Sequence, residues 1–154
     1  MKLYKKILLL LLFVFFVLQF IQPPKNSGKE ILSSDITRVF SVPQNVLDVL
    51  KTSCYDCHSN NTRYPWYSFI QPGAWWMAHH IEEGKQNLNF SDFGSYSLRR
   101  QQNKLRAVIN SIKDSTMPLK PYAVMHADAT LSNDKKIVVI RWMNKIKDSL
   151  ALLN

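Results

Sequence analysis

Cysteine is scarce in this chain, and its scarcity excludes several kinds of site. Cys54 and Cys57 are the only cysteines among 154 residues. No second cysteine pair completes a zinc site, and His79, His80 and His126 lack the spacing of zinc-finger ligands. The region around residue 54 also lacks the strand-rich pattern that surrounds a thioredoxin-like Cys-x-x-Cys pair. The sequence therefore disfavours both a zinc site and a thiol–disulfide redox pair.

Acidic residues are fewer than basic ones, and they form no convergent pair of carboxylates. Glu82 and Glu83 are adjacent on an expected helix, so their side chains point in different directions. Asp56 is expected to be a solvated loop acid rather than a catalytic group. This pattern favours a role other than catalysis, although it leaves an enzyme open.

The two cysteines belong to a five-residue motif, Cys54-Tyr55-Asp56-Cys57-His58. Cys-x-x-Cys-His is the attachment signature of a c-type haem. Two intervening residues on a helical turn place both sulfurs over one porphyrin edge, where each can form a thioether to a vinyl group. The adjacent His58 can then donate an imidazole nitrogen to the iron. The motif predicts one covalent haem c on Cys54 and Cys57, with His58 as the proximal iron ligand.

A six-coordinate haem needs a second axial ligand, which is a methionine or a histidine. We favour Met117, because it follows an expected helix and directly precedes Pro118 in a segment with little regular structure. Methionines inside the expected helices are more often core filler. His126, in the same irregular region, and His80 are the alternative distal ligands. An open distal position is the remaining possibility.

The N-terminus has the pattern of an export signal. Lys2, Lys5 and Lys6 precede an apolar run over residues 7–21. No small-residue cleavage site follows, so we expect residues 1–21 to remain as a signal anchor, although the run is short for a bilayer span of about 20 residues. The lysines predict a cytoplasmic N-terminus. We therefore expect a single-pass inner-membrane protein with its haem domain in the periplasm, or a periplasmic protein if the signal is cleaved.

The remaining chain reads as a linker over residues 22–40 and one haem c-binding domain over residues 41–150. Apolar spacing predicts an all-α domain of about four helices around one haem. The first helix begins near Pro43 and leads into the motif, and the second covers residues 74–83 and ends at Gly84. The other two cover residues 97–114 and 133–150. Residues 59–73, 85–96 and 115–130 are expected to be irregular.

Several segments resemble the haem-binding domain family of small exported c-type cytochromes. They are Cys54 to Ser59, Thr62 to Tyr67, Gly84 to Ser91, Met117-Pro118, Tyr122, His126, Leu131-Ser132 and Trp142. The resemblance extends from about residue 40 to residue 150. It implies covalent haem c on Cys54 and Cys57 and axial ligation by His58, and it does not settle the distal ligand. The family's usual Met-Pro-Pro is Met117-Pro118-Leu119 here.

The expected function is transfer of single electrons between redox partner proteins. A net charge of +9 could suit a protein that binds nucleic acid, but an exported protein does not encounter nucleic acid. The basic residues are also spread along the chain instead of forming one patch, so we expect no nucleic-acid partner. No small-molecule substrate is evident. The alternatives are a haem-based sensor or ligand-binding module with an open distal site, and a small peroxidase-like enzyme using an acid–base group such as His126.

Overall fold

The computed structural model describes residues 2–28 and 30–153, and this part of the chain is all-helical. The all-α class is thereby confirmed, with eight α-helices in the described residues: one in the segment expected as the signal anchor and seven after it, where about four were expected. An isolated antiparallel bridge joins Ser27 to Asn61. The α-helices are α1 (Leu3–Leu18), α2 (Ile36–Val39), α3 (Gln44–Ser53), α4 (Tyr55–His58), α5 (Gly73–Asn87), α6 (Leu98–Lys113), α7 (Lys120–Met125) and α8 (Asn133–Ala151). Three 3₁₀ turns, η1 (Trp66–Phe69), η2 (Phe90–Ser95) and η3 (Ala127–Ala129), lie between them.

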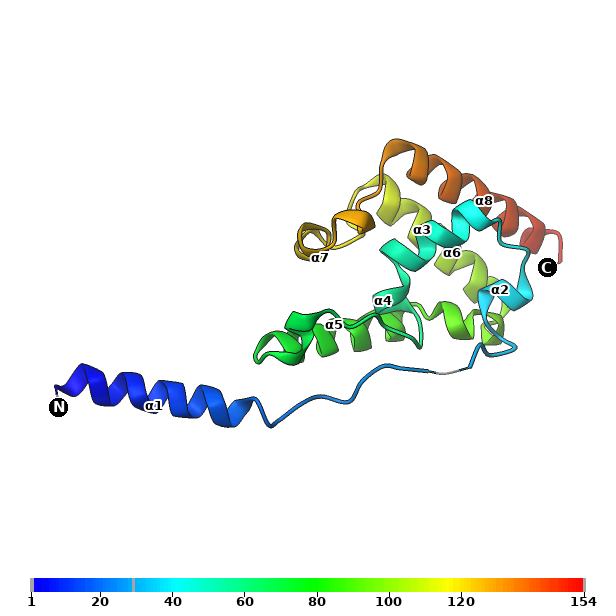
Figure 1. Cartoon of the computed structure of the whole chain (residues 1–154). Helices are drawn as coiled ribbons and strands as arrows, with labels where there is room; N and C mark the ends of the chain where they lie inside the picture. Colours follow the sequence, from blue (N-terminus) through cyan, green and yellow to red (C-terminus); the bar gives the residue numbers. More distant parts are fainter. Residues whose placement is uncertain (1, 29, 154) are drawn as a thin grey trace.

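The core forms where α6 and α8 pack along each other and α3 packs against α8 (Figure 1). These three helices match three of the four expected ones. Serine caps start two of them, since Ser97 accepts from the Arg100 amide and Ser132 accepts from the Lys135 amide. The core side chains are Ile36, Val46, Val49, Leu50, Leu88, Phe90, Phe93, Leu105, Ile109, Ile112, Val139, Trp142, Met143, Ile146 and Leu150.

Helix α5 does not end at Gly84, which corrects the expectation for the second helix. It continues to Asn87. Gly84 lies where α5 crosses the haem motif, and a Cβ atom built on it would come 2.6 Å from the Cys57 carbonyl oxygen. The glycine therefore permits close approach of two helices inside a continuing helix, instead of ending one.

The stretch expected as a linker lies against the body. The Asn26 side chain donates to the Ser59 carbonyl and to the Thr62 hydroxyl, and the Gly28 amide donates to the Asn60 carbonyl. Further on, this stretch forms α2, whose Ile36 is fully buried. The region after α6, expected to be irregular, contains the short helix α7.

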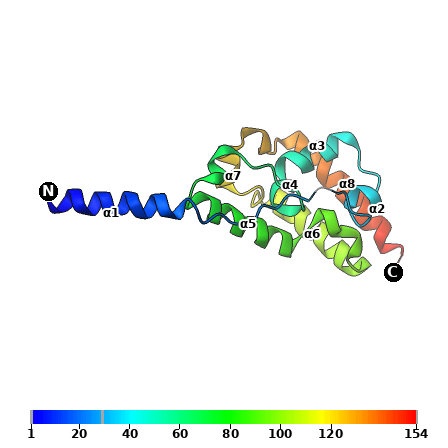
Figure 2. The same cartoon turned by 60° about the horizontal axis from the view of Figure 1, so that its bottom comes forward.

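Helix α1 projects from one end of the body (Figure 2). Its 16 residues are apolar apart from Tyr4, Lys5 and Lys6, and none of its side chains is buried. Among the residues that the structure describes, no helix combines the length and apolar character needed to cross a membrane.

Candidate functional site

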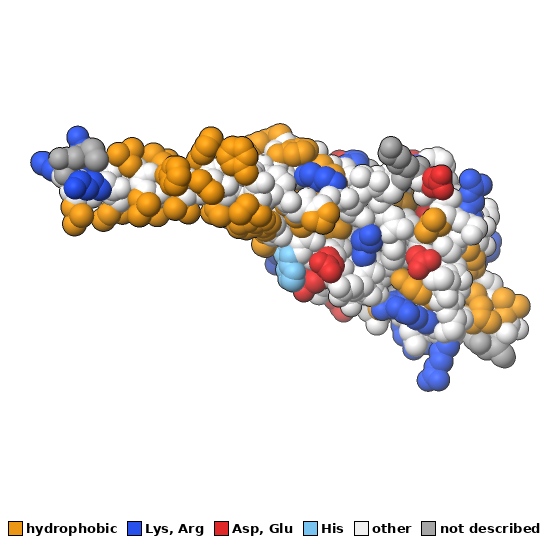
Figure 3. Space-filling model, turned by 90° about the horizontal axis from the view of Figure 1, so that it is seen from below, with side chains coloured by type: hydrophobic (Ala, Val, Ile, Leu, Met, Phe, Trp, Pro, Cys, Tyr) orange, Lys and Arg blue, Asp and Glu red, His pale blue; other side chains and the backbone are white. Residues whose placement is uncertain are grey.

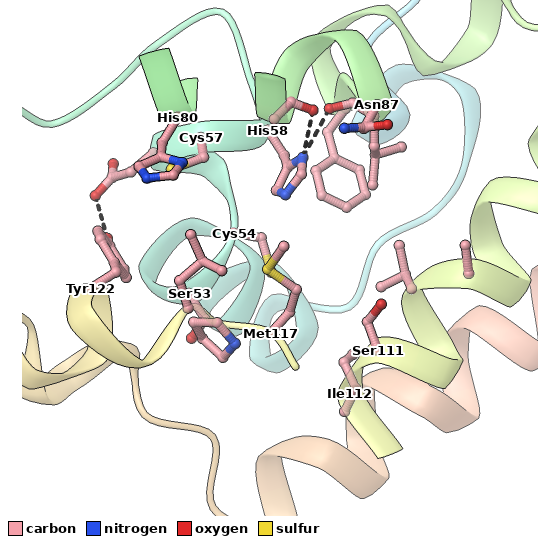
Figure 4. Close-up of a pocket in the computed structure, with 18 of the residues that line it drawn as sticks. Ser53, Cys54, Cys57, His58, His80, Asn87, Ser111, Ile112, Met117 and Tyr122 are labelled. Carbon is pink, nitrogen blue, oxygen red and sulfur yellow. Dashed lines mark hydrogen bonds between the residues drawn. The ribbon is translucent and has the colours of Figure 1, made fainter. Parts of the chain in front are cut away.

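A cavity of about 520 Å³ brings together most of the sequence-predicted site residues. Its wall is mostly apolar, and it is formed by the haem motif, α5, α6 and the segment that leads into α7 (Figure 4). Cys54, Cys57, His58, Met117 and His80 all line it. The other lining residues are Ser53, Asp56, Glu83, Gly84, Asn87, Leu88, Phe90, Lys104, Ala107, Val108, Ser111, Ile112, Pro118, Leu119, Tyr122 and Leu131.

The imidazole of His58 is held by main-chain carbonyl groups near the end of α5. Its Nδ1 lies 2.8 Å from the Gly84 oxygen and 3.0 Å from the Leu88 oxygen. Carbonyl oxygens only accept hydrogen bonds, so Nδ1 carries the proton and Nε2 keeps a free lone pair. Figure 4 shows the other edge of the ring facing the cavity. This arrangement presents Nε2 as a ligand for a metal inside the cavity.

The two cysteines stand on one tight turn. Cys54 ends α3, and its carbonyl oxygen accepts from the amides of Cys57 and His58. Burial raises the pKa of the Cys54 thiol to about 12, helped by the nearby Cys57. Burial, followed by the charge of Asp56, raises the pKa of the Cys57 thiol to about 11. Both thiols are therefore protonated at neutral pH, whereas a thiol–disulfide redox pair needs a lowered pKa.

Asp56 is not the solvated loop acid that the sequence suggested. Its side chain is buried and accepts from the Arg63 amide at 3.0 Å, from the Arg63 guanidinium at 3.2 Å and from the Tyr122 hydroxyl at 2.6 Å. The hydrogen bond to Asp56 raises the pKa of Arg63. Burial, and then the same carboxylate, raise the pKa of Tyr122. A charged carboxylate can be buried here because three donors satisfy it.

The candidate distal ligands lie in three different environments. Met117 stands across the cavity from His58 (Figure 4). His80 also lines the cavity, but it belongs to α5, the helix that holds His58, and its Nδ1 lies 3.4 Å from Glu83. His126 does not line the cavity. Its Nε2 lies 3.1 Å from the Tyr67 hydroxyl, and its ring stacks on Tyr122.

Sequence reasoning missed the groups that hold the motif in place. The carbonyl groups of Gly84 and Leu88 leave no signal in the sequence, since any residue type carries a carbonyl. Arg63 follows Asp56 by seven residues and lies in a segment expected to be irregular, so the ion pair between them can be recognised only once the path of that loop is known.

The donor set of the cavity fits a haem. Two thiols on one turn, an imidazole with a free Nε2 and a thioether share a mostly apolar wall, and a porphyrin needs apolar surroundings together with axial nitrogen or sulfur ligands. In the described part of the chain, no three His, Cys, Asp or Glu side chains gather to hold a metal ion by themselves.

Comparison with known proteins gives one clear relationship. Searches of curated proteins and of solved structures gave no match. The family model described as "Haem-binding domain" matches residues 13–145, which is most of the chain and includes the whole cavity wall. The protein therefore belongs to the haem-binding domain family, and haem is its cofactor.

Proposed function

We propose that this protein is a membrane-tethered, mono-haem c-type cytochrome that carries single electrons between redox partner proteins. Cys54 and Cys57 bind the haem covalently, His58 is its proximal iron ligand and Met117 its distal one. The observation that carries the proposal is the geometry of His58. The carbonyl groups of Gly84 and Leu88 accept hydrogen bonds from its Nδ1–H, and Nε2 is thereby directed into the cavity that both cysteines and Met117 also line.

The residues around the cavity suit an electron carrier. A bound haem supplies an iron that accepts and releases one electron. The carbonyl groups of Gly84 and Leu88 keep the imidazole of His58 in one orientation and one tautomer. Phe90, Leu88 and Ile112 supply apolar wall, which excludes water. A soft thioether opposite an imidazole favours the reduced iron and raises the reduction potential.

The structure supports Met117 over His80 as the distal ligand. A ligand opposite His58 has to come from the facing wall of the cavity. His80 is on α5, whose carbonyl groups hold His58, whereas Met117 comes from the segment between α6 and α7. His126 is engaged by Tyr67 outside the cavity, so no observation favours a peroxidase-like use of this histidine.

The test is expression in a host that matures c-type haem, followed by intact mass and absorption spectra. We expect a mass gain of one covalent haem and a methionine–iron charge-transfer band. The band should vanish in Met117→Ala and persist in Met125→Ala, because Met125 is in the neighbouring segment, is exposed and does not line the cavity. A protein with no added haem, or a band that survives Met117→Ala, contradicts the proposal.

A haem-based sensor or ligand-binding module is the second candidate. Met117 is 39% exposed and belongs to no helix, so it could leave the iron without disturbing the core. This candidate predicts a high-spin spectrum and ready binding of carbon monoxide by the unaltered protein. A low-spin spectrum that carbon monoxide does not change excludes it.

Export and tethering are proposed from the N-terminal pattern. Lys2, Lys5 and Lys6 at the start of α1, followed by the apolar rest of the helix, suit a retained signal anchor, with the haem domain in the periplasm. The intact mass of protein recovered from membranes should include residues 1–21. A soluble protein whose N-terminus follows residue 20 contradicts this part of the proposal.

A further inference from the structure

One end of the body exposes large apolar side chains next to the root of α1. Trp66, Phe69 and Ile70 come from η1 and the residue after it, and Trp75 and Trp76 come from the first turns of α5. Trp66 is 74% exposed, the most open of the five. We call these five residues the aromatic end. A water-facing domain rarely groups so many large apolar side chains without a partner for them.

Hydrogen bonds join the aromatic end to the root of α1. Gln71 is buried, and its backbone amide donates to the Gln19 side chain at 2.9 Å. Its side-chain amide donates to the Ile21 carbonyl at 2.7 Å, and its side-chain oxygen accepts from the Trp75 amide. The exposed apolar surface of α1 therefore continues onto the body, as the orange side chains of Figure 3 show.

A lysine accompanies the exposed rings. The Nζ of Lys25 lies 3.9 Å from the ring centre of Phe69 and 4.2 Å from that of Tyr64, and it donates to the Ser68 carbonyl. Tryptophan rings and lysine side chains concentrate where lipid headgroups meet acyl chains, because each has an apolar part and a polar or charged part. An exposed lysine beside exposed aromatic rings is thus the combination expected of a surface at the lipid–water interface.

The length of α1 points to the same environment. Its 16 residues rise by about 24 Å, whereas a bilayer hydrocarbon core is about 30 Å thick. An apolar helix that is too short is accommodated when flanking groups enter the interface. Lys2, Lys5 and Lys6 lie at the far end of α1, and the aromatic end lies at its root.

We infer that the aromatic end lies in the lipid–water interface of a bilayer that also takes up α1, so that the haem domain rests on the membrane instead of hanging from a free linker. This inference rests on the proposed tether and adds to it a fixed contact between the domain and lipid.

The experiment uses the full-length, haem-loaded protein in vesicles of phosphatidylcholine and phosphatidylglycerol that contain a phospholipid with a diazirine in its upper acyl chain. After illumination, mass spectrometry identifies the labelled peptides. We expect adducts on α1 and on residues 64–76. Leu152 and Leu153 are as exposed and apolar as the aromatic end but lie just after α8, so their peptide should remain unlabelled.

The matched variant is Trp66→Ser with Trp75→Ser, which removes two exposed rings, keeps the Trp75 backbone amide that donates to Gln71, and changes no residue that lines the cavity. It should lower labelling of residues 64–76 several-fold while labelling of α1 and the haem spectrum stay unchanged. Labelling confined to α1 overturns the inference and leaves the tether standing, because the aromatic end then meets water or a protein. Absence of labelling on α1 removes the tether as well. Equal labelling at Leu152 and Leu153 also overturns the inference, because lipid contact is then unspecific.

Discussion

The imidazole of His58 takes its direction from peptide carbonyls rather than from another side chain. One of the two carbonyls belongs to Gly84, which also lets α5 approach the motif closely. The same residue therefore places α5 near Cys57 and orients the proposed iron ligand. Its missing side chain is a requirement of the site.

Gly84→Ala should destabilise the protein, although alanine normally stabilises the middle of a helix by up to about 1 kcal/mol over glycine. The new Cβ would lie 2.6 Å from the Cys57 oxygen and 3.1 Å from the Cys57 Cβ. Overpacking of this kind costs about 1–3 kcal/mol. Chemical unfolding of the two proteins measures the difference.

The control for this prediction is Gly73→Ala at the start of α5. A Cβ there meets only the Tyr67 oxygen, at 3.5 Å, which is ordinary contact. Its free energy of unfolding should stay within about 0.5 kcal/mol of the parent. Equal effects of the two substitutions would show that the approach of α5 to the motif is not tight.

A side-chain hydrogen bond joins helix α7 to the haem motif, between two residues that are 66 positions apart in the sequence. The Tyr122 hydroxyl donates to Asp56, and Arg63 neutralises the same carboxylate. Because Met117 lies just before α7, this bond limits how far the proposed distal ligand can move away from the cavity. One hydrogen bond can hold a helix of only six residues in position because its acceptor is a charged, buried carboxylate.

Tyr122→Phe should lower the free energy of unfolding by about 1–2 kcal/mol, since it deletes one donor to a buried carboxylate. It should also weaken the methionine–iron band by loosening the segment that carries Met117. The comparison is Asp128→Asn, which removes an exposed ion pair to Arg63 at 3.6 Å and should cost under about 0.5 kcal/mol. A larger loss in Asp128→Asn than in Tyr122→Phe would contradict this account.

Raising the pH should lower the stability of these two variants to different extents. Burial and Asp56 raise the pKa of Tyr122 above its ordinary value of 10.0, so the folded protein keeps this proton while the unfolded chain loses it. The stability that this retained Tyr122 proton contributes is fully present below pH 10 and is lost as the pH rises beyond 10. Unfolding measured from pH 8 to 10.5 should show a shallower loss of stability in Tyr122→Phe than in Asp128→Asn.

At the scale of the whole molecule, the folded domain extends beyond the boundary that composition suggests. Asn26 and Gly28 bond to the loop after the motif, and α2 contributes Ile36 to the core. The family match likewise begins at residue 13. The segment after α1 is thus held to the body at several points, which limits the distance between α1 and the haem cavity.

Ile36→Ala should cost about 2–5 kcal/mol, because it opens a cavity at a fully buried position. Ile31→Ala, five residues earlier in the same segment and 64% exposed, should cost less than about 0.5 kcal/mol. Thermal or chemical unfolding of the two haem-loaded variants measures both losses of stability. Equal stability of both variants would mean that residues 22–40 behave as the simple linker that the sequence suggests.

The local features of this protein follow from its amino-acid order alone. The Cys54-to-His58 motif and the apolar spacing of α6 and α8 are both readable, because each depends on residues close together in the sequence. The prediction that Met117 lies near the motif also needed only the order of helices and prolines along the chain. In the structure, Met117 lines the cavity that the motif residues line.

How those parts meet becomes evident only in the folded chain. His58 bonds to carbonyl groups 26 and 30 residues away, and Asp56 is buried by a tyrosine 66 residues away. Gly84 looked like a helix end, because glycine often ends helices, and only the nearness of Cys57 shows that close packing is its role. Contacts between distant segments depend on the path of the whole chain, so composition and periodicity carry no record of them.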